Sequence, residues 1–222
     1  MSDWRFDNYT AQPAVATKGA AWMDNVPTSA ATVLGLDLLL QESCIDLRAA
    51  SELVLSDVGA TLQIMRLIAH EFPYSSERPT RMDDCLACLD VNTWFNVLSD
   101  RTLFRKWNYN KITSVWQHCR LVGQYAKLIA ESLDDVSADE AYLVGLLHEL
   151  DTLPFLLDSK AVKAGSMAGP TLEQTIPSFV LAALDSAKER GSSSVWRYIL
   201  SSAHALAEAM PKLDSVSPRS YK

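Results

Sequence analysis

The sequence has 222 residues, of which 48% are hydrophobic and 21% charged, as expected of a globular protein of one domain or two small subdomains that buries a sizeable core. Its formal net charge of −7 argues against nonspecific binding to nucleic acid, because a phosphate backbone attracts concentrated positive charge. No apolar run approaches the ~20 residues needed to cross a bilayer, and the acidic start MSDWRFDNYT does not resemble a signal peptide, so we expect a cytoplasmic protein without a membrane partner.

Helical periodicity dominates the first half of the chain. Asp46 is placed to cap one predicted helix, and Asp57 or Ser56 to open the next, because these side chains accept bonds from the first free amides of a helix. Pro73 and Pro79 bracket a loop. The predicted helices cover residues 31–43, 47–55, 58–72, the segment MDDCLACLDV at 82–91, and 90–104.

The chain is predicted to break near residues 108–110, and longer helices follow. Ser137 and Glu140 have the spacing of a capping box, which predicts the start of a helix that runs through His148 toward Pro154. The other predicted helices cover residues 112–133, 178–190 and 195–210, and a loop rich in small residues covers 158–170.

These patterns predict an all-α fold, since alternating apolar and polar runs bounded by turn residues are missing from the sequence. We expect two packed helical subdomains, over about residues 19–108 and 109–210. An N-terminal extension over 1–18 and a frayed tail over 211–222 complete the predicted organisation.

Four cysteines are present, and two of them, Cys85 and Cys88, have CxxC spacing. No second pair exists to complete four zinc ligands, and the surrounding sequence predicts a helix where a redox motif would follow a strand. One helical turn apart on one face, both residues are expected to be small core residues. We therefore predict reduced thiols that bind no metal.

A basic segment interrupts the acidic sequence between the two predicted subdomains. It contains Arg101, Arg105, Lys106 and Lys111, interleaved with Phe104, Trp107 and Tyr109. Such a patch can hold a nucleotide, and these four basic residues are candidates for ligand binding. The alternative is a solvated face next to a helix junction.

Three predicted helices each carry a histidine near the buried face. These are His118, His148, which is followed by Glu149, and His204. The doublet does not belong to a zincin motif, because HExxH requires a histidine where Thr152 stands. Two imidazoles and a carboxylate can hold a divalent metal and activate a water. Alternatively, half-buried histidines are satisfied by backbone carbonyls.

The chain resembles the HDOD domain, a degenerate relative of the HD phosphohydrolases found in bacterial signalling proteins. The resemblance covers roughly residues 19–210 and is strongest over SVWQHCRLVGQYAKLIAESLDDVSADEAYLVGLLHEL. There the family has a Trp-x-His helix and then an acid-capped helix ending in Gly-Leu-Leu-His-Asp. The family's opening helices are similar to VPTSAATVLGLDLLLQESCIDLRAASELVLSDVGATLQIMRLIAH. Its next helix pair is similar to RMDDCLACLDVNTWFNVL, and its closing pair is similar to IPSFVLAALDSAKERGSSSVWRYILSSAHALA.

Departures from the HD pattern concern the metal ligands. The His-Asp doublet is His148-Glu149 here, and His204 stands where the HD superfamily places its last metal-binding aspartate. The resemblance therefore implies that His118, His148, Glu149 and His204 form a vestigial metal site. We expect no resident cofactor and no catalysis, although a softer ion such as zinc or nickel can still bind three imidazoles.

From the resemblance we expect a non-catalytic regulatory domain that acts through an unidentified protein partner of a signalling system. One alternative is the binding of a nucleotide or second messenger without turnover, with charge from the basic segment. The other is residual metal-dependent phosphohydrolase or phosphodiesterase activity, in which Arg120 or Lys127 contacts the phosphate.

Overall fold

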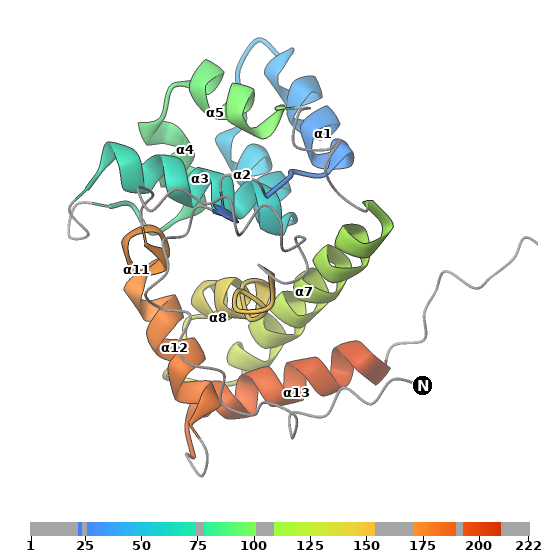
Figure 1. Cartoon of the computed structure of the whole chain (residues 1–222), viewed down its shortest axis with the longest axis vertical. Coiled ribbons are helices and arrows are strands. Elements are labelled where there is room, and N and C mark those ends of the chain that lie inside the picture. The colour runs from blue at the N-terminus through green and yellow to red at the C-terminus, as the bar shows by residue number, and fades with distance from the viewer. Residues whose placement is uncertain are drawn as a thin grey trace, which may run out of the picture.

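The structure, a computed structural model, describes residues 22–23, 26–73, 78–100, 109–153, 171–189 and 193–209, and every regular element within these ranges is helical (Figure 1). The predicted all-α fold is confirmed. The helices are α1 (Ala30–Leu40), α2 (Leu47–Leu55), α3 (Val58–Glu71), α4 (Met82–Cys88), α5 (Val91–Leu98), α7 (Tyr109–Ala130), α8 (Ala138–Leu146), α11 (Leu172–Thr175), α12 (Ser178–Lys188) and α13 (Val195–Ala209). None of these described helices is both long and apolar enough to cross a membrane.

Buried apolar side chains form two clusters. One lies among α1 to α5 and includes Ile64 and Trp94. The other lies among α7, α8, α12 and α13 and includes Val122 and Val144. Helix α3 joins them, because Leu62 belongs to the second cluster while Ile64 belongs to the first. Figure 1 shows the corresponding arrangement, with α1 to α5 above and α7, α8, α12 and α13 below.

Asp57 ties the first turn of α3 to the start of α1. Its carboxylate is buried and accepts bonds from the amide of Ala60, from the amide of Ser29 at 2.7 Å and from the hydroxyl of Thr32 at 3.0 Å. The capping roles predicted for Asp57 and Asp46 are confirmed. Because Asp57 caps one helix while holding the cap of another, α1 and α3 keep a fixed relative position.

Several predicted boundaries differ from the structure. Helix α1 begins at Ala30, after an N-cap at Ser29. The break predicted at 108–110 is wrong for Tyr109 and Asn110, because both are part of α7. Helix α5 ends at Leu98. The predicted extension at 1–18, the loop at 158–170 and the tail at 211–222 lie outside the described residues.

Helices α7 and α8 contact each other through their backbones. A Cβ atom placed on Gly145 of α8 would lie 2.7 Å from the Cα atom of Gly123 of α7, which is closer than real Cβ contacts. A Cβ atom on Gly123 would lie 3.0 Å from the carbonyl oxygen of Tyr142. Glycine is required at this crossing because a side chain there would push the two helices apart.

We predict that Gly145→Ala destabilises the protein, whereas Gly35→Ala does not. Both glycines lie inside helices, where alanine ordinarily stabilises by about 0.5–1 kcal/mol. At Gly145 the new Cβ meets backbone, and such overpacking costs about 1–3 kcal/mol. At Gly35 it meets the end of the Leu53 side chain at 3.0 Å, which can move aside. Urea denaturation of both variants measures the difference, and equal midpoints would contradict the close crossing.

Candidate metal centre

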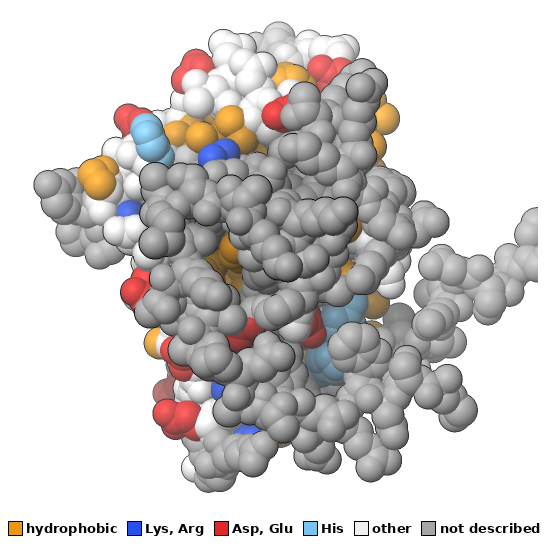
Figure 2. All heavy atoms as spheres, viewed as in Figure 1, with side chains coloured by type: hydrophobic (Ala, Val, Ile, Leu, Met, Phe, Trp, Pro, Cys, Tyr) orange, Lys and Arg blue, Asp and Glu red, His pale blue; other side chains and the backbone are white. Residues whose placement is uncertain are grey.

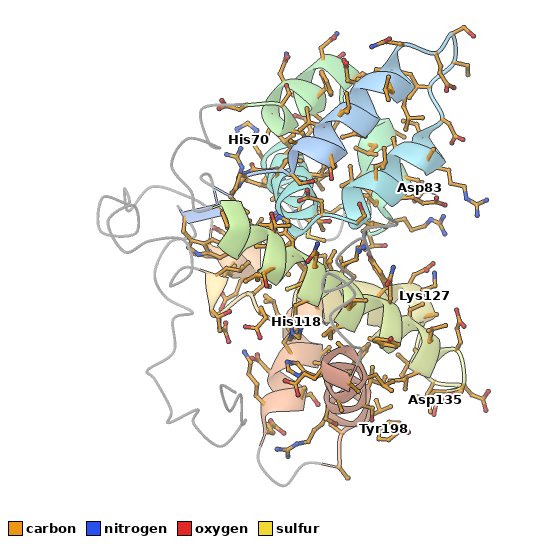
Figure 3. All side chains as sticks on the ribbon, turned by 90° about the vertical axis from the view of Figure 1, so that its right-hand side faces the viewer. His70, Asp83, His118, Lys127, Asp135 and Tyr198 are labelled. Carbon is orange, nitrogen blue, oxygen red and sulfur yellow. The ribbon has the colours of Figure 1, made fainter. Side chains whose placement is uncertain are left out.

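The fold brings His118, His148, Glu149 and His204 together. One potential ligand atom from each residue lies within 4.8 Å of the corresponding atoms of the other three. The ring centroid of His118 is 5.2 Å from that of His148 and 4.7 Å from that of His204, and the last two are 5.6 Å apart. Figure 3 shows the side chain of His118 below α7, the helix that carries it, and Figure 2 shows histidine side chains grouped near acidic ones in the lower half of the molecule.

Packing of α7 and α13 places two of the imidazoles. Cys119 and Val122 of α7 are buried, so His118, next to Cys119, lies at the edge of the face that α7 turns toward the core. Ala203 of α13 is buried in the same cluster, and His204 follows it at the edge of the helix interface. Both imidazoles are half-buried as a result.

His148 lies just after the end of α8, and the prediction that this helix continues through it is wrong. Helix α8 ends at Leu146, and turns follow. The ring Nδ1 of His148 lies 2.7 Å from the carbonyl oxygen of Gly145. In a continuing α-helix that carbonyl would accept from the amide of Glu149. We infer that the imidazole competes for this carbonyl, and the chain turns at the site.

The same bond defines the protonation of His148. A carbonyl oxygen only accepts, so Nδ1 carries the proton and Nε2 of the neutral ring has a lone pair. Nε2 is buried, and within the described part of the chain it has no hydrogen-bond partner. It lies 3.5 Å from Oε1 of Glu149. Burial lowers the pKa of His148 to about 4, although the Glu149 carboxylate opposes this shift.

Two further side chains contact potential ligands of the cluster. The Glu149 carboxylate accepts a hydrogen bond from the hydroxyl of Thr152. Nδ1 of His204 lies 3.4 Å from Oε1 of Glu208, one helical turn later on α13. Burial, reinforced by the charge of His204, lowers the pKa of His118. The contact between His204 and Glu208 could have been predicted from the sequence, because residues four apart lie next to each other on one face of a helix.

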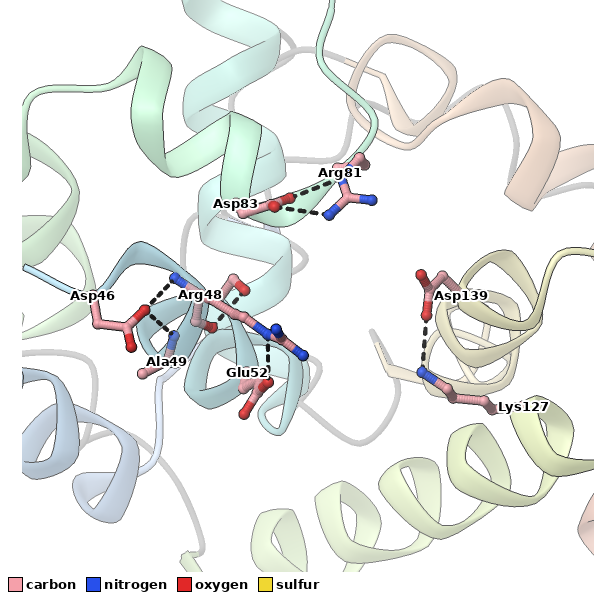
Figure 4. A network of polar contacts seen from close by, with 9 residues as sticks. Asp46, Arg48, Ala49, Glu52, Arg81, Asp83, Lys127 and Asp139 are labelled. Atoms are coloured by element: carbon pink, nitrogen blue, oxygen red, sulfur yellow. Dashed lines mark hydrogen bonds and ion pairs between the residues drawn. The ribbon is translucent and has the colours of Figure 1, made fainter.

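Neither basic residue considered for phosphate contact joins the cluster. Lys127 donates to Asp139 at 2.9 Å in an exposed ion pair, one of the surface contacts in Figure 4. Arg120 lies two residues beyond His118 on α7, which turns it by about 200° around the helix axis. Arg120 instead lines a cavity of about 230 Å³ on another side of α7.

That cavity lies between the start of α1 and α7 and was not predicted from the sequence. Its lining includes Thr28, Asp57, Trp116 and Arg120. Thr28 Oγ1 and Trp116 Nε1 are buried, and neither has a hydrogen-bond partner among the described residues. Residues so far apart in the chain form no sequence motif, so only the packing of α7 against the first helices reveals the cavity.

The basic segment proposed as a ligand site falls mostly outside the described residues. This applies to Arg101, Arg105 and Lys106, while Lys111 lies in α7 without a described side chain.

The CxxC cysteines are only partly as predicted. Both are free cysteines on α4, but Cys85 is buried and Cys88 is exposed, so the prediction of two core residues is wrong for Cys88. Met82, Cys85 and Leu86 belong to the buried cluster, whereas Cys88 is the last residue of the helix and lies beyond it. Burial raises the pKa of Cys85 to about 12.

Comparison with known proteins gives a family and a fold. The HDOD domain family matches residues 26–166 of the chain. Two crystal structures of the MmoQ response regulator from Methylococcus capsulatus str. Bath are similar in fold. One has a TM-score of 0.63 at 16% identity and covers 88% of each chain. The other has a TM-score of 0.61 at 15% identity and covers 85% of this chain and 90% of its own. No curated protein matches the chain.

We predict that the four cysteines divide into two classes of reactivity. Cys44 and Cys88 are exposed and react with iodoacetamide under native conditions. Cys85 and Cys119 are buried, and burial raises the pKa of both thiols, so they react only after unfolding. Peptide mass spectrometry with and without urea measures this division, and rapid native labelling of Cys85 would contradict the packing of α4.

Proposed function

The chain belongs to the HDOD domain family, and on that premise we propose that it is a non-catalytic regulatory domain of a signalling system that acts by binding another protein. The observation that carries this proposal is the chemistry of the candidate metal centre. Its four residues supply three imidazoles and a single carboxylate. Magnesium and manganese, which assist phosphoester hydrolysis in many enzymes, prefer oxygen ligands, and only Glu149 supplies them here.

The surroundings of the centre support the absence of hydrolysis. Phosphoester hydrolysis is assisted by Arg or Lys side chains that contact the phosphate. Lys127 is paired with Asp139, and Arg120 lies on another side of α7. Thr152 donates a hydrogen bond to one oxygen of Glu149, the single carboxylate among the four residues of the centre.

Two features support protein binding. The first is the likeness in fold to a protein described as a response regulator. The second is a pair of exposed apolar side chains on α1, Leu34 at 59% and Leu38 at 58% exposure. They lie one helical turn apart and form an apolar stripe on the surface, of the kind that a partner helix covers.

We predict that the purified chain does not hydrolyse phosphoesters. The assay supplies cyclic dinucleotides, nucleoside phosphates and a generic phosphodiester, with magnesium, manganese, zinc and nickel in turn. His148→Ala and the matched variant His70→Ala, which changes an exposed histidine outside the centre, serve as controls. Turnover that depends on metal and is abolished only in His148→Ala would overturn the proposal and make the chain an enzyme.

A second candidate function is the binding of a small ligand without turnover in the cavity between α1 and α7. The unpartnered groups of Thr28 and Trp116, with the guanidinium of Arg120, favour a ligand rich in hydrogen-bond acceptors, such as part of a nucleotide. Fluorescence titration of the same compounds tests it. Saturable binding that Trp116→Phe and Arg120→Gln weaken would support this candidate over protein binding alone.

A further inference from the structure

We propose that His118, His148, His204 and Glu149 bind one zinc ion, which joins α7, the turn after α8 and α13. This inference goes beyond the proposed function, since it assigns the centre a structural metal rather than a catalytic one. The four potential ligand atoms come from three separate parts of the chain and all lie within 4.8 Å of one another. The ion would therefore connect three elements that lie far apart in the sequence.

The separations fit a tetrahedral ion after small side-chain rotations. Zinc binds nitrogen and oxygen ligands at about 2.0–2.2 Å, so four tetrahedral ligands lie roughly 3.4 Å apart. Atoms spread over at most 4.8 Å reach that spacing if each moves by about 1 Å or less. The imidazole rings are inclined to one another by 59° to 86°, so they are not stacked and their nitrogens can converge on one point.

His148 already has the orientation of a metal ligand. In metal sites the coordinating histidine usually donates its other ring N–H to a carbonyl or carboxylate, which fixes the ring and its tautomer. Nδ1 of His148 donates to the carbonyl of Gly145, and the lone pair of Nε2 is left in a buried site facing the Glu149 carboxylate. A lone pair and a carboxylate 3.5 Å apart repel each other, and a cation between them would turn that repulsion into two attractive contacts.

His204 shows a similar arrangement. Glu208 lies 3.4 Å from its Nδ1, in the position that an outer partner takes when the other ring nitrogen binds a metal.

The ligand set selects the kind of ion. Three imidazoles and one carboxylate suit zinc, and nickel or cobalt bind similar sets, whereas magnesium and calcium require more oxygen ligands. All four positions of a tetrahedral ion are filled by protein atoms, as in structural zinc sites, so no open position is left for an activated water. This closed coordination agrees with a domain that does not hydrolyse phosphoesters.

The test uses the full chain without a polyhistidine tag, stripped with a chelator and titrated with zinc chloride by calorimetry. The variants are His148→Ala, His204→Ala and His70→Ala. The last removes an exposed histidine outside the centre and controls for nonspecific binding. Circular dichroism checks that each variant folds, and His204, at the edge of α13 with a side chain 17% exposed, is the substitution that disturbs the core least.

We expect one zinc per chain in the unsubstituted protein and in His70→Ala. Affinity should fall by more than about 100-fold in His148→Ala and His204→Ala, beyond the roughly 10–100-fold that loss of an outer partner costs. At a hundredfold excess of zinc over its dissociation constant, the melting temperature of the unsubstituted chain should rise by about 5–10 °C.

Three results would overturn the zinc site. They are the absence of stoichiometric binding by the unsubstituted chain, equal affinity in His204→Ala, or an equal loss in His70→Ala. Because the readouts are binding and melting, they are independent of the hydrolysis assay. Zinc binding with phosphoester turnover would overturn both the proposed function and the structural role of the ion. Neither zinc binding nor turnover would overturn only the zinc site.

Discussion

The backbone contact between Gly123 and Gly145 is the constraint on which the candidate metal centre depends. It lets α8 lie directly against α7, with small residues such as Ala126 filling the space around the crossing. His118 stands five residues before Gly123, and His148 three residues after Gly145. The spacing of α7 and α8 at the glycines therefore sets the distance between the two imidazoles, and the packing of α13 on α7 adds the third.

Gly145 has a second role, because its carbonyl accepts the Nδ1 proton of His148. One residue thus permits the helix contact and, through its carbonyl, orients the imidazole just after α8. A closely packed crossing and an oriented ligand arise from the same short segment. The other side of α7 carries Trp116 and Arg120 at the cavity, so this helix separates two polar features that have different chemistry.

Local signals predicted much of the fold. Helical periodicity gave the helices, and the capping roles of Asp46, Asp57 and Ser137 follow from side chains that bond to amides two or three residues away. Helical periodicity also placed the three histidines near the buried faces of their helices. Features that depend on other parts of the chain were missed. Helix α8 ends where the His148 side chain bonds back to the Gly145 carbonyl, and the exposure of Cys88 depends on where α4 leaves its neighbours.

Anomalous diffraction at the zinc absorption edge, from crystals of the chain grown with zinc, tests most directly whether the crossing of α7 and α8 assembles a metal centre. The account predicts one strong peak within about 2.0–2.2 Å of nitrogens from His118, His148 and His204 and an oxygen of Glu149. It also predicts that Gly123 and Gly145 remain in contact beside it. Peaks confined to surface carboxylates, with the three imidazoles directed away from one another, would contradict the account.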